Sequence, residues 1–302
     1  MTTLRGTVLE RDGSVYRVAT DRGTVSAVLR GKAKRDTLRV VVGDRVALDD
    51  DAGSGETLGI IAVEERQSLL ERRVPEGRGA RPVAANIDQV LVVTASTDPA
   101  PIPQLIDRLL VVAEANSLPA ALILNKVDLD RGTALAARLR AAGYQVFPTS
   151  IKTGEGIAEI RERLQRRISV VTGPSGAGKS SLLNVVQPGL KLRVGEISAK
   201  LRRGTNTTVS AIMLPLDGGG FLVDTPGFSE VGLWGIDPSQ LDSCFPEMRP
   251  FLGACKYGDC RHVSEPGCAV TAAVASGAVL PDRLESYRVL LGELDDQPEE
   301  WE

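Results

Sequence analysis

The sequence predicts an α/β protein in which a nucleotide-binding core lies between two smaller domains, and four observations support this. A complete phosphate loop of the form G-x-x-x-x-G-K-[ST] spans residues 173–180. Before it, apolar segments of strand length alternate with segments of helical spacing, which is typical of a parallel sheet with helices on both faces. Short β-like segments fill the N-terminal region, and the four cysteines all fall in the last third. We therefore expect domains at residues 1–70, 71–238 and 239–302.

Length and composition bound the class of protein. The 302 residues give room for two or three domains, and the apolar content of 42% and charged content of 25% are those of a soluble globular protein. No apolar run reaches the ~18 to 20 residues of a membrane helix, and residues 1–5 do not begin a signal peptide. We therefore expect a cytoplasmic protein without membrane contact. Nothing in the sequence calls for an oligomer, so a monomer is expected.

Residues 1–70 predict a small barrel of the OB type. Five β-like segments lie at 5–9, 14–19, 24–29, 44–48 and 58–63, and we expect them to pair in antiparallel fashion. Basic residues between Arg30 and Arg45 could contact RNA phosphates, although the net charge of −3 argues against indiscriminate nucleic-acid binding. The alternative is a solvated loop on a barrel that only packs against its neighbour. Tyr16 is the only aromatic residue of the region, so base-specific readout is not expected.

The core begins after a connector. Residues 64–81 are rich in charge, Pro and Gly, which indicates an extended or mobile linker with a domain boundary near residue 70. The pattern then predicts strands at 87–94, 120–124, 145–149 and 168–172, and helices at 104–116, 134–142 and 157–166.

The phosphate loop is Gly173-Pro174-Ser175-Gly176-Ala177-Gly178-Lys179-Ser180. Gly173 and Gly178 allow the backbone to curl around a polyphosphate with its N–H groups pointing inward. Lys179 would lie across the terminal phosphates, the Ser180 hydroxyl would bind Mg²⁺, and the following helix would add the positive charge of its N-terminus. The phosphate loop alone identifies neither the base of the bound nucleotide nor the reaction. It also resembles the loop of guanylate kinases, so a nucleotide kinase is an alternative.

Two motifs at the ends of strands indicate guanine. Asn125-Lys126-Val127-Asp128 follows the strand at 120–124, and Ser150-Ile151-Lys152 follows the next strand. The Asp128 carboxylate can accept hydrogen bonds from the ring N–H and the exocyclic amino group of guanine together, a donor pair that adenine lacks. Asn125 would brace the neighbouring loops, Lys126 would lie along the base, and the backbone around Ser150 would reach the base oxygen.

The remaining motifs follow the phosphate loop. Asp224-Thr225-Pro226-Gly227 ends a predicted strand, so Asp224 can hold Mg²⁺ through water and the Gly227 N–H can meet the γ-phosphate. Between the phosphate loop and Asp224, a threonine of residues 203–208 could complete the Mg²⁺ shell and sense the γ-phosphate. Ordinary GTPases place the phosphate loop first and the guanine motifs last, and this chain reverses the two groups. The order predicts a circularly permuted P-loop GTPase core, in which the segment beyond Asp224 leads directly into the C-terminal domain.

The C-terminal domain carries a metal-ligand pattern, C-x4-C-x-H-x5-C, at Cys255, Cys260, His262 and Cys268. Three cysteines and one histidine suit a tetrahedral Zn²⁺ ion, and four protein ligands make the site structural. His262 is the only histidine of the chain. The alternative is a set of buried cysteines with a surface histidine. Cys244 falls outside the spacing and is expected in the core, and residues 282–292 predict a helix.

With these motifs in this order, the chain resembles the ribosome small-subunit-dependent GTPase A family over nearly its whole length. The resemblance implies GTP hydrolysis stimulated by the small (30S) ribosomal subunit during its late maturation, and rRNA contacts by the barrel and the zinc domain. The implied ligand residues are Gly173, Pro174, Ser175, Gly176, Ala177, Gly178, Lys179, Ser180 and Ser181 for phosphate; Asn125, Lys126, Asp128, Ser150 and Lys152 for guanine; Ser180, Thr208 and Asp224 for magnesium; and Cys255, Cys260, His262 and Cys268 for one zinc ion.

The chain departs from that family in its switch segment. The family usually has G-x-H-T-T-T, and its histidine is implicated in organising the attacking water, whereas this chain has Asn206 at that position. Asparagine can orient water but cannot accept its proton near neutral pH. The residues expected to serve hydrolysis are Lys179, Asn206, Thr208, Asp224 and Gly227.

Three functional hypotheses follow from the sequence. The first is a GTPase activated by the small subunit and its rRNA. The second is a GTP-bound RNA or ribosome scaffold in which hydrolysis is incidental, which Asn206 favours. The third is the nucleotide kinase, which the phosphate loop alone favours.

Overall fold

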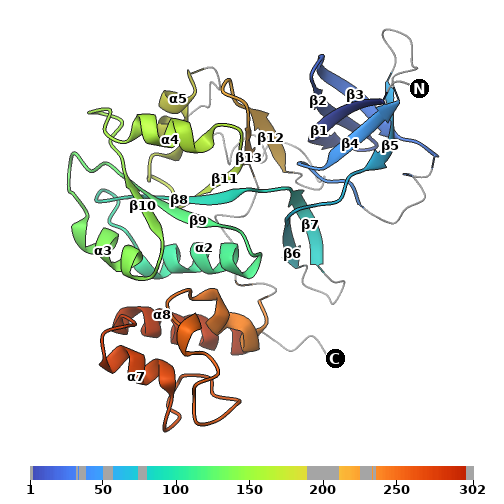
Figure 1. The fold of residues 1–302 in the computed structure, drawn as a ribbon. Helices are drawn as coiled ribbons and strands as arrows, with labels where there is room; N and C mark the ends of the chain where they lie inside the picture. The colour runs from blue at the N-terminus through green and yellow to red at the C-terminus, as the bar shows by residue number, and fades with distance from the viewer. Residues whose placement is uncertain are drawn as a thin grey trace.

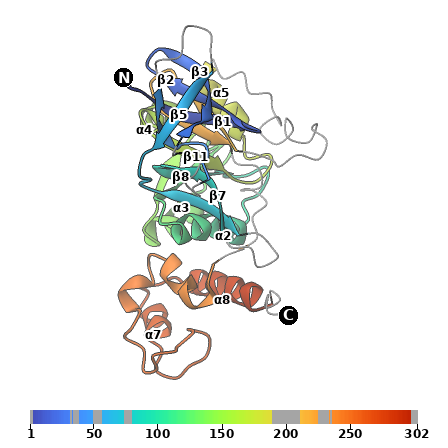
Figure 2. The same ribbon diagram turned by 90° about the vertical axis from the view of Figure 1, so that its right-hand side faces the viewer.

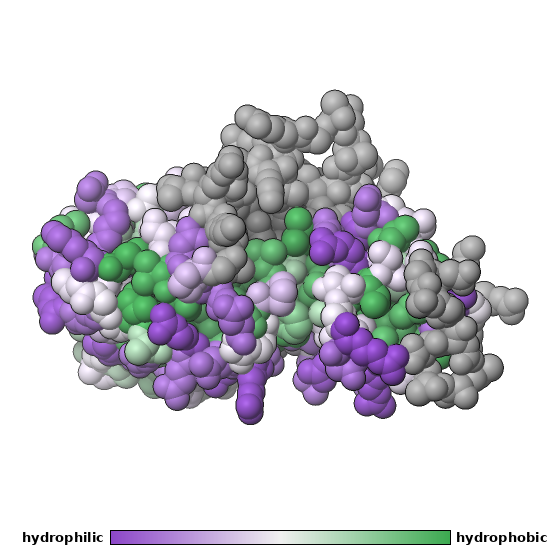
Figure 3. Space-filling view, turned by 90° about the horizontal axis from the view of Figure 1, so that it is seen from above, coloured by the Kyte–Doolittle hydropathy of each residue, from purple (hydrophilic) through white to green (hydrophobic). Residues whose placement is uncertain are grey.

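The computed structural model describes residues 3–31, 33, 39–49, 57–73, 80–188, 211–224, 233 and 236–296. An N-terminal barrel lies at one side of a central sheet, and a C-terminal helical unit lies below that sheet in both ribbon views (Figures 1 and 2). Among the described residues, no helix is both long enough and apolar enough to cross a membrane. The face seen from above mixes hydrophilic and hydrophobic residues (Figure 3).

The barrel consists of β1 (Thr3–Asp12), β2 (Val15–Thr20), β3 (Gly23–Leu29), β4 (Arg45–Asp49) and β5 (Leu58–Val63), closed in the order β1-β2-β3-β5-β4. The predicted five-stranded barrel is therefore confirmed. One part of the expectation was wrong, because β3 pairs with β5 in parallel while the other four pairs are antiparallel. Tyr16 lies in the barrel core, 2% exposed, and so offers no ring for base stacking.

The connector forms a two-stranded antiparallel sheet rather than only an extended linker. Strand β6 (Leu69–Arg73) pairs with β7 (Ala80–Ala85), starting from Leu69 opposite Ala85. Strand propensity alone misses this pair, because its residues gain their partners only when the segment folds back on itself.

A buried carboxylate fixes the barrel to this connector. Asp44, with no exposed surface, accepts hydrogen bonds from Arg66 Nε at 2.7 Å, Arg66 Nη2 at 2.9 Å and the Val41 N–H at 2.8 Å. The neighbouring Gly43 has a φ of 86°, and a Cβ there would lie 2.0 Å from the Ala85 oxygen. Only glycine allows this close approach between the barrel and β7.

The central sheet has six strands in the order β10-β9-β8-β11-β13-β12. They are β8 (Gln89–Ala95), β9 (Ala120–Asn125), β10 (Gln145–Pro148), β11 (Ile168–Thr172), β12 (Ile212–Pro215) and β13 (Phe221–Asp224). All are parallel except β12, which pairs antiparallel to β13. The predicted parallel sheet is confirmed.

Helices cover both faces of the sheet, as Figure 1 shows: α2 (Pro103–Ala115) and α3 (Thr133–Ala141) on one face, α4 (Ile157–Leu164) and α5 (Lys179–Val186) on the other. Alternate side chains of β8 point to opposite faces of the sheet and pack with different helices. Val90 and Val92 pack with α2 and α3, whereas Leu91 and Val93 pack with α4 and α5. The continuous apolar run of residues 90–93 is what a strand in a sheet covered on both faces requires.

The strand order sets the place of the site. From β8 the chain moves outward through β9 to β10, and it then returns to add β11 on the other side of β8. The loops after β8 and β11 therefore diverge at the carboxyl edge of the sheet. Such a switch point is where open α/β sheets bind ligands.

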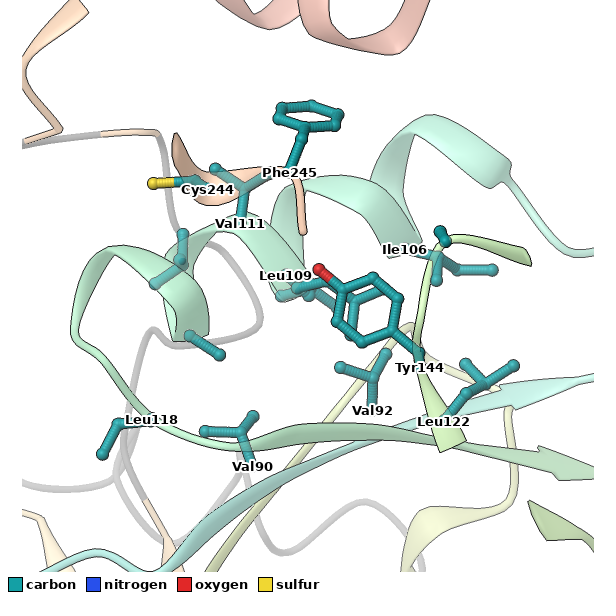
Figure 4. Close-up of a cluster of buried hydrophobic side chains, with 14 of the residues drawn as sticks. Val90, Val92, Ile106, Leu109, Val111, Leu118, Leu122, Tyr144, Cys244 and Phe245 are labelled. Atoms are coloured by element: carbon teal, nitrogen blue, oxygen red, sulfur yellow. The ribbon is translucent and has the colours of Figure 1, made fainter. Parts of the chain in front are cut away.

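The C-terminal unit consists of η3 (Pro238–Cys244), η4 (Arg249–Phe251), α7 (Ala269–Ala275) and α8 (Pro281–Asp295). Its core is continuous with the layer formed by α2 and α3. Figure 4 shows Phe245 and Cys244 from the C-terminal unit beside Leu109 and Val111 of α2, with Tyr144 below them. Cys244 is 4% exposed, which confirms its predicted place in the core.

Buried charges also join the two units. Asp107 of α2 accepts hydrogen bonds from both Nη atoms of Arg138 at 2.8 and 2.6 Å and from Arg283 Nη1 of α8 at 2.6 Å. Arg283 donates in addition to Glu247 and lies over the Phe245 ring at 4.7 Å. Burial by itself would raise the pKa of Asp107, but the hydrogen bond from Arg138 and the positive charges outweigh it and hold that pKa below its usual value. The contribution of Asp107 to stability is therefore full above the ordinary carboxyl pKa and is lost as the pH falls through the lowered one.

We expect Arg283→Met to lower the free energy of unfolding by about 3–5 kcal/mol, because it leaves the Glu247 carboxylate buried without its cation. The matched control is Arg131→Met, which removes an exposed ion pair with Glu155 and should cost about 0–1 kcal/mol. Urea denaturation of the two variants and the parent measures both values. Equal losses would show that the network does not hold the units together.

Candidate functional site

The phosphate loop lies at the switch point, between β11 and α5. Its glycines adopt backbone angles that other residues avoid, with φ of 139° at Gly173, 79° at Gly176 and 89° at Gly178. A Cβ on Gly173 would lie 2.0 Å from the Val93 oxygen, so the loop passes tightly over the end of β8. The sequence therefore needs glycine here for both conformation and space.

Lys179 folds back over its own loop. Its Nζ donates to the Gly173 oxygen at 2.6 Å and to the Pro174 oxygen at 2.8 Å. Burial lowers the pKa of Lys179, because the charged ammonium loses hydration. An anionic ligand in the loop would favour the charged form again. Ser180 and Ser181 are half-buried in the first turn of α5, whereas Ser175 is exposed.

Asn125 joins the phosphate loop to the strands beside it. Its side chain has no exposed surface, and its Nδ2 donates to the Ala177 oxygen at 2.9 Å. The Thr149 hydroxyl, at the end of β10, donates to Asn125 Oδ1 at 3.3 Å. A Cβ on Gly178 would lie 2.5 Å from Asn125 Nδ2. Asn125 therefore braces the neighbouring loops as the sequence predicts.

The two guanine signatures meet. Ser150 Oγ donates to Asp128 Oδ1 at 2.6 Å, and it accepts from the Thr153 N–H at 3.2 Å. The exposed Asp128 carboxylate is thus held in one orientation at the mouth of the site. Lys152 is exposed on the following turn. The arrangement offers a carboxylate fork for a base and a glycine loop for phosphates at one edge of the sheet.

Four predicted residues are described in part or not at all. The backbone of Asp224 ends β13, next to β11, and so reaches the same edge as the phosphate loop. Asn206, Thr208 and Gly227 lie outside the described residues.

One segment at this edge was not predicted. Residues 96–99 follow β8 and contact both the Asn125–Asp128 segment and the phosphate loop: Ser96 Oγ donates to the Lys126 oxygen at 2.9 Å, and Pro99 lies against Gly176. No motif marks Ser96. The only available signal was its place at the carboxyl end of the central strand.

The C-terminal cluster brings together all four predicted ligands. The Sγ atoms of Cys255, Cys260 and Cys268 and one nitrogen of His262 lie within 4.8 Å of one another. His262 Nδ1 lies 3.7, 3.6 and 3.3 Å from the sulfurs of Cys255, Cys260 and Cys268. The set could hold a metal ion.

Neighbouring groups orient these ligands. His262 Nε2 lies 3.3 Å from Asp242 Oδ2 of η3, which leaves Nδ1 to face the sulfurs. The backbone N–H groups of Ala269 and Thr271 donate to the sulfurs of Cys255 and Cys268 at 3.3 and 3.4 Å. Arg288 of α8 donates to the His262 oxygen at 3.2 Å.

Comparison with known proteins agrees with this geometry. A family model described as RsgA GTPase matches residues 63–234. The chain is 49% identical to the small ribosomal subunit biogenesis GTPase RsgA of Gemmatimonas aurantiaca, covering 97% of this chain and 98% of that protein. It is 40% identical to the protein of the same name from Moorella thermoacetica, covering 96% and 97%.

Two solved structures are similar as well. One is YjeQ from Thermotoga maritima, with a TM-score of 0.81 and 35% identity, covering 98% of this chain and 100% of that chain. The other is YloQ, described as a circularly permuted GTPase, with a TM-score of 0.78 and 27% identity, covering 99% and 97%.

We expect the purified chain to hold one metal ion, and Cys260→Ser to lose it, because the change removes one of four ligands. Cys244→Ser is the matched control, since Cys244 lies outside the cluster and should keep one ion per chain. Elemental analysis measures both. A chelator should lower the melting temperature of the parent and of Cys244→Ser but not that of Cys260→Ser. An unchanged metal content in Cys260→Ser would contradict the assignment.

Proposed function

This chain belongs to the RsgA GTPase family, and from that premise we propose that it hydrolyses GTP in the late maturation of the small ribosomal subunit, activated by binding that subunit and its rRNA. That the chain is a GTPase follows from the family itself. The names of its relatives, small ribosomal subunit biogenesis GTPases, indicate the small subunit as the partner that we propose. The observation that carries the proposal is the hydrogen bond from Asn125 to Ala177, which joins the base motif to the phosphate loop in one site.

The nucleotide contacts that we propose follow this geometry. Asp128, oriented by Ser150, would accept the two guanine donors, and Lys126 and Lys152 would lie near the base. Residues 173–181 would hold the phosphates. Lys179 would exchange its bonds to the loop carbonyls for bonds to phosphate oxygens, whose negative charge would offset the lowering of its pKa by burial.

Magnesium belongs to the same proposal. Ser180, Thr208 and Asp224 would hold the ion, directly or through water, and the ion would neutralise charge that develops on the phosphates. Gly227 would donate its N–H to the γ-phosphate, and Asn206 would orient the attacking water.

We propose that the metal of the C-terminal cluster is one structural zinc ion. Three thiolates and an imidazole are ligands that zinc favours, and a tetrahedral site with Zn–S near 2.3 Å and Zn–N near 2.05 Å separates N from S by about 3.6 Å. The three separations at His262 Nδ1, 3.3 to 3.7 Å, fit that geometry.

A division of labour among the domains follows. Residues 1–70 would contact rRNA through the barrel, residues 71–238 would bind and hydrolyse GTP, and residues 239–302 would carry zinc and a second rRNA contact. The core position of Tyr16 supports phosphate contacts over base stacking for the barrel. We propose that the chain acts as a monomer in the cytoplasm.

The test is GTP hydrolysis measured against increasing concentrations of purified small subunit. We expect strong stimulation that is specific to GTP and to the small subunit. ATP and large subunits serve as the controls. Stimulation by large subunits to the same extent, or hydrolysis of ATP at the same rate, would contradict the proposal.

A second function has one observation in its favour. Asn206 replaces the family's usual histidine, so the chain could act as a GTP-bound ribosome scaffold whose hydrolysis is incidental. Tight GTP binding without stimulation by small subunits would favour this alternative.

We expect Asn206→His to raise the rate of single-turnover hydrolysis at saturating GTP by about tenfold or more, because histidine can accept a proton from the attacking water. The dissociation constant for GTP should stay within about twofold of the parent, since the residue acts on water rather than on the nucleotide. Rapid quench with and without small subunits measures the rate. No gain in either condition would mean that this position does not limit hydrolysis.

A further inference from the structure

We propose that Ser96 is a positioning residue for guanine recognition, which it serves by fixing the peptide of Lys126 in the orientation that presents Asp128 to the base. This inference rests on the proposed GTP site. It adds a residue that belongs to none of the GTPase motifs.

Ser96 is tied to the guanine motif through two bonds. Its backbone N–H donates to the Asn125 oxygen at 2.8 Å, and its Oγ donates to the Lys126 oxygen at 2.9 Å. Lys126 Nζ in turn donates to the backbone oxygen of Asp98. Residues 96–98 thus hold Lys126 from both its backbone and its side chain.

These bonds support a backbone conformation that is otherwise costly. Lys126 has a φ of 64°, in the left-handed region that residues with a side chain rarely adopt. Such a conformation persists only where surrounding contacts determine it. The Val127 N–H, which donates to the Thr149 oxygen at 3.1 Å, fixes the next peptide. Asp128 comes two residues after Lys126, so the backbone conformation at Lys126 sets the position of the Asp128 carboxylate.

The same segment reaches the phosphate side. A Cβ on Gly176 would lie 3.2 Å from Pro99 Cδ, and the loop beside it bonds to Asn125 through Ala177. Ser96 itself is 7% exposed. It packs closely against Gly132, where a Cβ would lie 3.3 Å from Ser96 Cβ. The Ser96 hydroxyl is therefore held where it donates to the Lys126 oxygen of the Asn125–Asp128 motif.

Loss of the hydroxyl has a specific consequence. Without it, the Lys126 oxygen loses its bond from Ser96 and the turn loses one of the contacts that hold its left-handed conformation. The base contact weakens, and GDP and GTP should be affected alike because the γ-phosphate lies elsewhere in the site. The preference for guanine over hypoxanthine should also fall, since hypoxanthine lacks the exocyclic amino group whose hydrogen bond Asp128 would accept.

The experiment compares Ser96→Ala with Ser169→Ala. Ser169, in β11, is also buried (0% exposed) and accepts a hydrogen bond from Gln89 Nε2 at 2.9 Å, but it lies near the amino end of its strand, away from the nucleotide edge. Both variants lose one buried hydroxyl, so both should lower the melting temperature. Titration calorimetry with GDP, GTP, inosine diphosphate and ADP then separates a loss of stability from a loss of positioning.

We expect Ser96→Ala to bind GDP and GTP about 5- to 30-fold more weakly, the effect of one buried hydrogen bond. Its preference for GDP over inosine diphosphate should fall by at least about threefold, while Ser169→Ala keeps the affinities and the preference of the parent. Affinities of Ser96→Ala within about twofold of the parent, or equal losses in the two variants, would overturn the inference. If the parent itself did not prefer GDP to ADP, the proposed GTP site would fail instead.

Discussion

The hydrogen bond from Asn125 to the Ala177 oxygen is the contact on which the nucleotide site depends. It joins two motifs that lie 52 residues apart, and it is buried, so water cannot replace it. Chain order does not matter to such a bond. Permutation moves the phosphate loop behind the base motif, yet the parallel sheet still brings β9 and β11 to either side of β8, and their loops meet at the same edge. The position of the nucleotide site is therefore set by the order of strands in the sheet and not by the order of motifs in the chain.

What permutation changes is the connection to the C-terminal unit. The chain leaves β13 beside the phosphate loop and continues into η3, while α2, which follows the segment at Ser96, carries Asp107 to Arg283. Helix α2, which follows the nucleotide edge in the chain, therefore packs against the same helical unit to which β13 leads in sequence. Its attachment is a mixture of apolar packing and buried charge, and buried charge tolerates displacement poorly because each ion depends on its partners.

The sequence predicted the parts that repeat a pattern and missed those that depend on partners. Short apolar segments predicted the barrel, and alternating strand and helix segments predicted the sheet. Glycine spacing and the N-K-x-D motif predicted the phosphate loop and the base motif beside it, and the cysteine spacing predicted the cysteine–histidine cluster. Asp107, Arg138 and Arg283 look like ordinary surface charges in a helix, and nothing in their spacing shows that they face one another. Ser96 is hidden for the same reason, since its partner is a backbone oxygen 30 residues away. The parallel β3–β5 pair and the β6–β7 sheet likewise arise from tertiary pairing.

The metal cluster extends the same chain of contacts. Asp242 orients His262 from η3, whose last residue, Cys244, precedes Phe245. Phe245 meets Tyr287 edge to face at 5.5 Å, and Tyr287 donates to the Arg261 oxygen beside the cluster at 2.9 Å. Arg283 lies one turn earlier on α8, over Phe245 and bonded to Asp107. A metal ion bound by Cys255, Cys260, His262 and Cys268 would therefore also support the surface that receives α2, because these ligands, Phe245 and Arg283 belong to one continuous set of contacts.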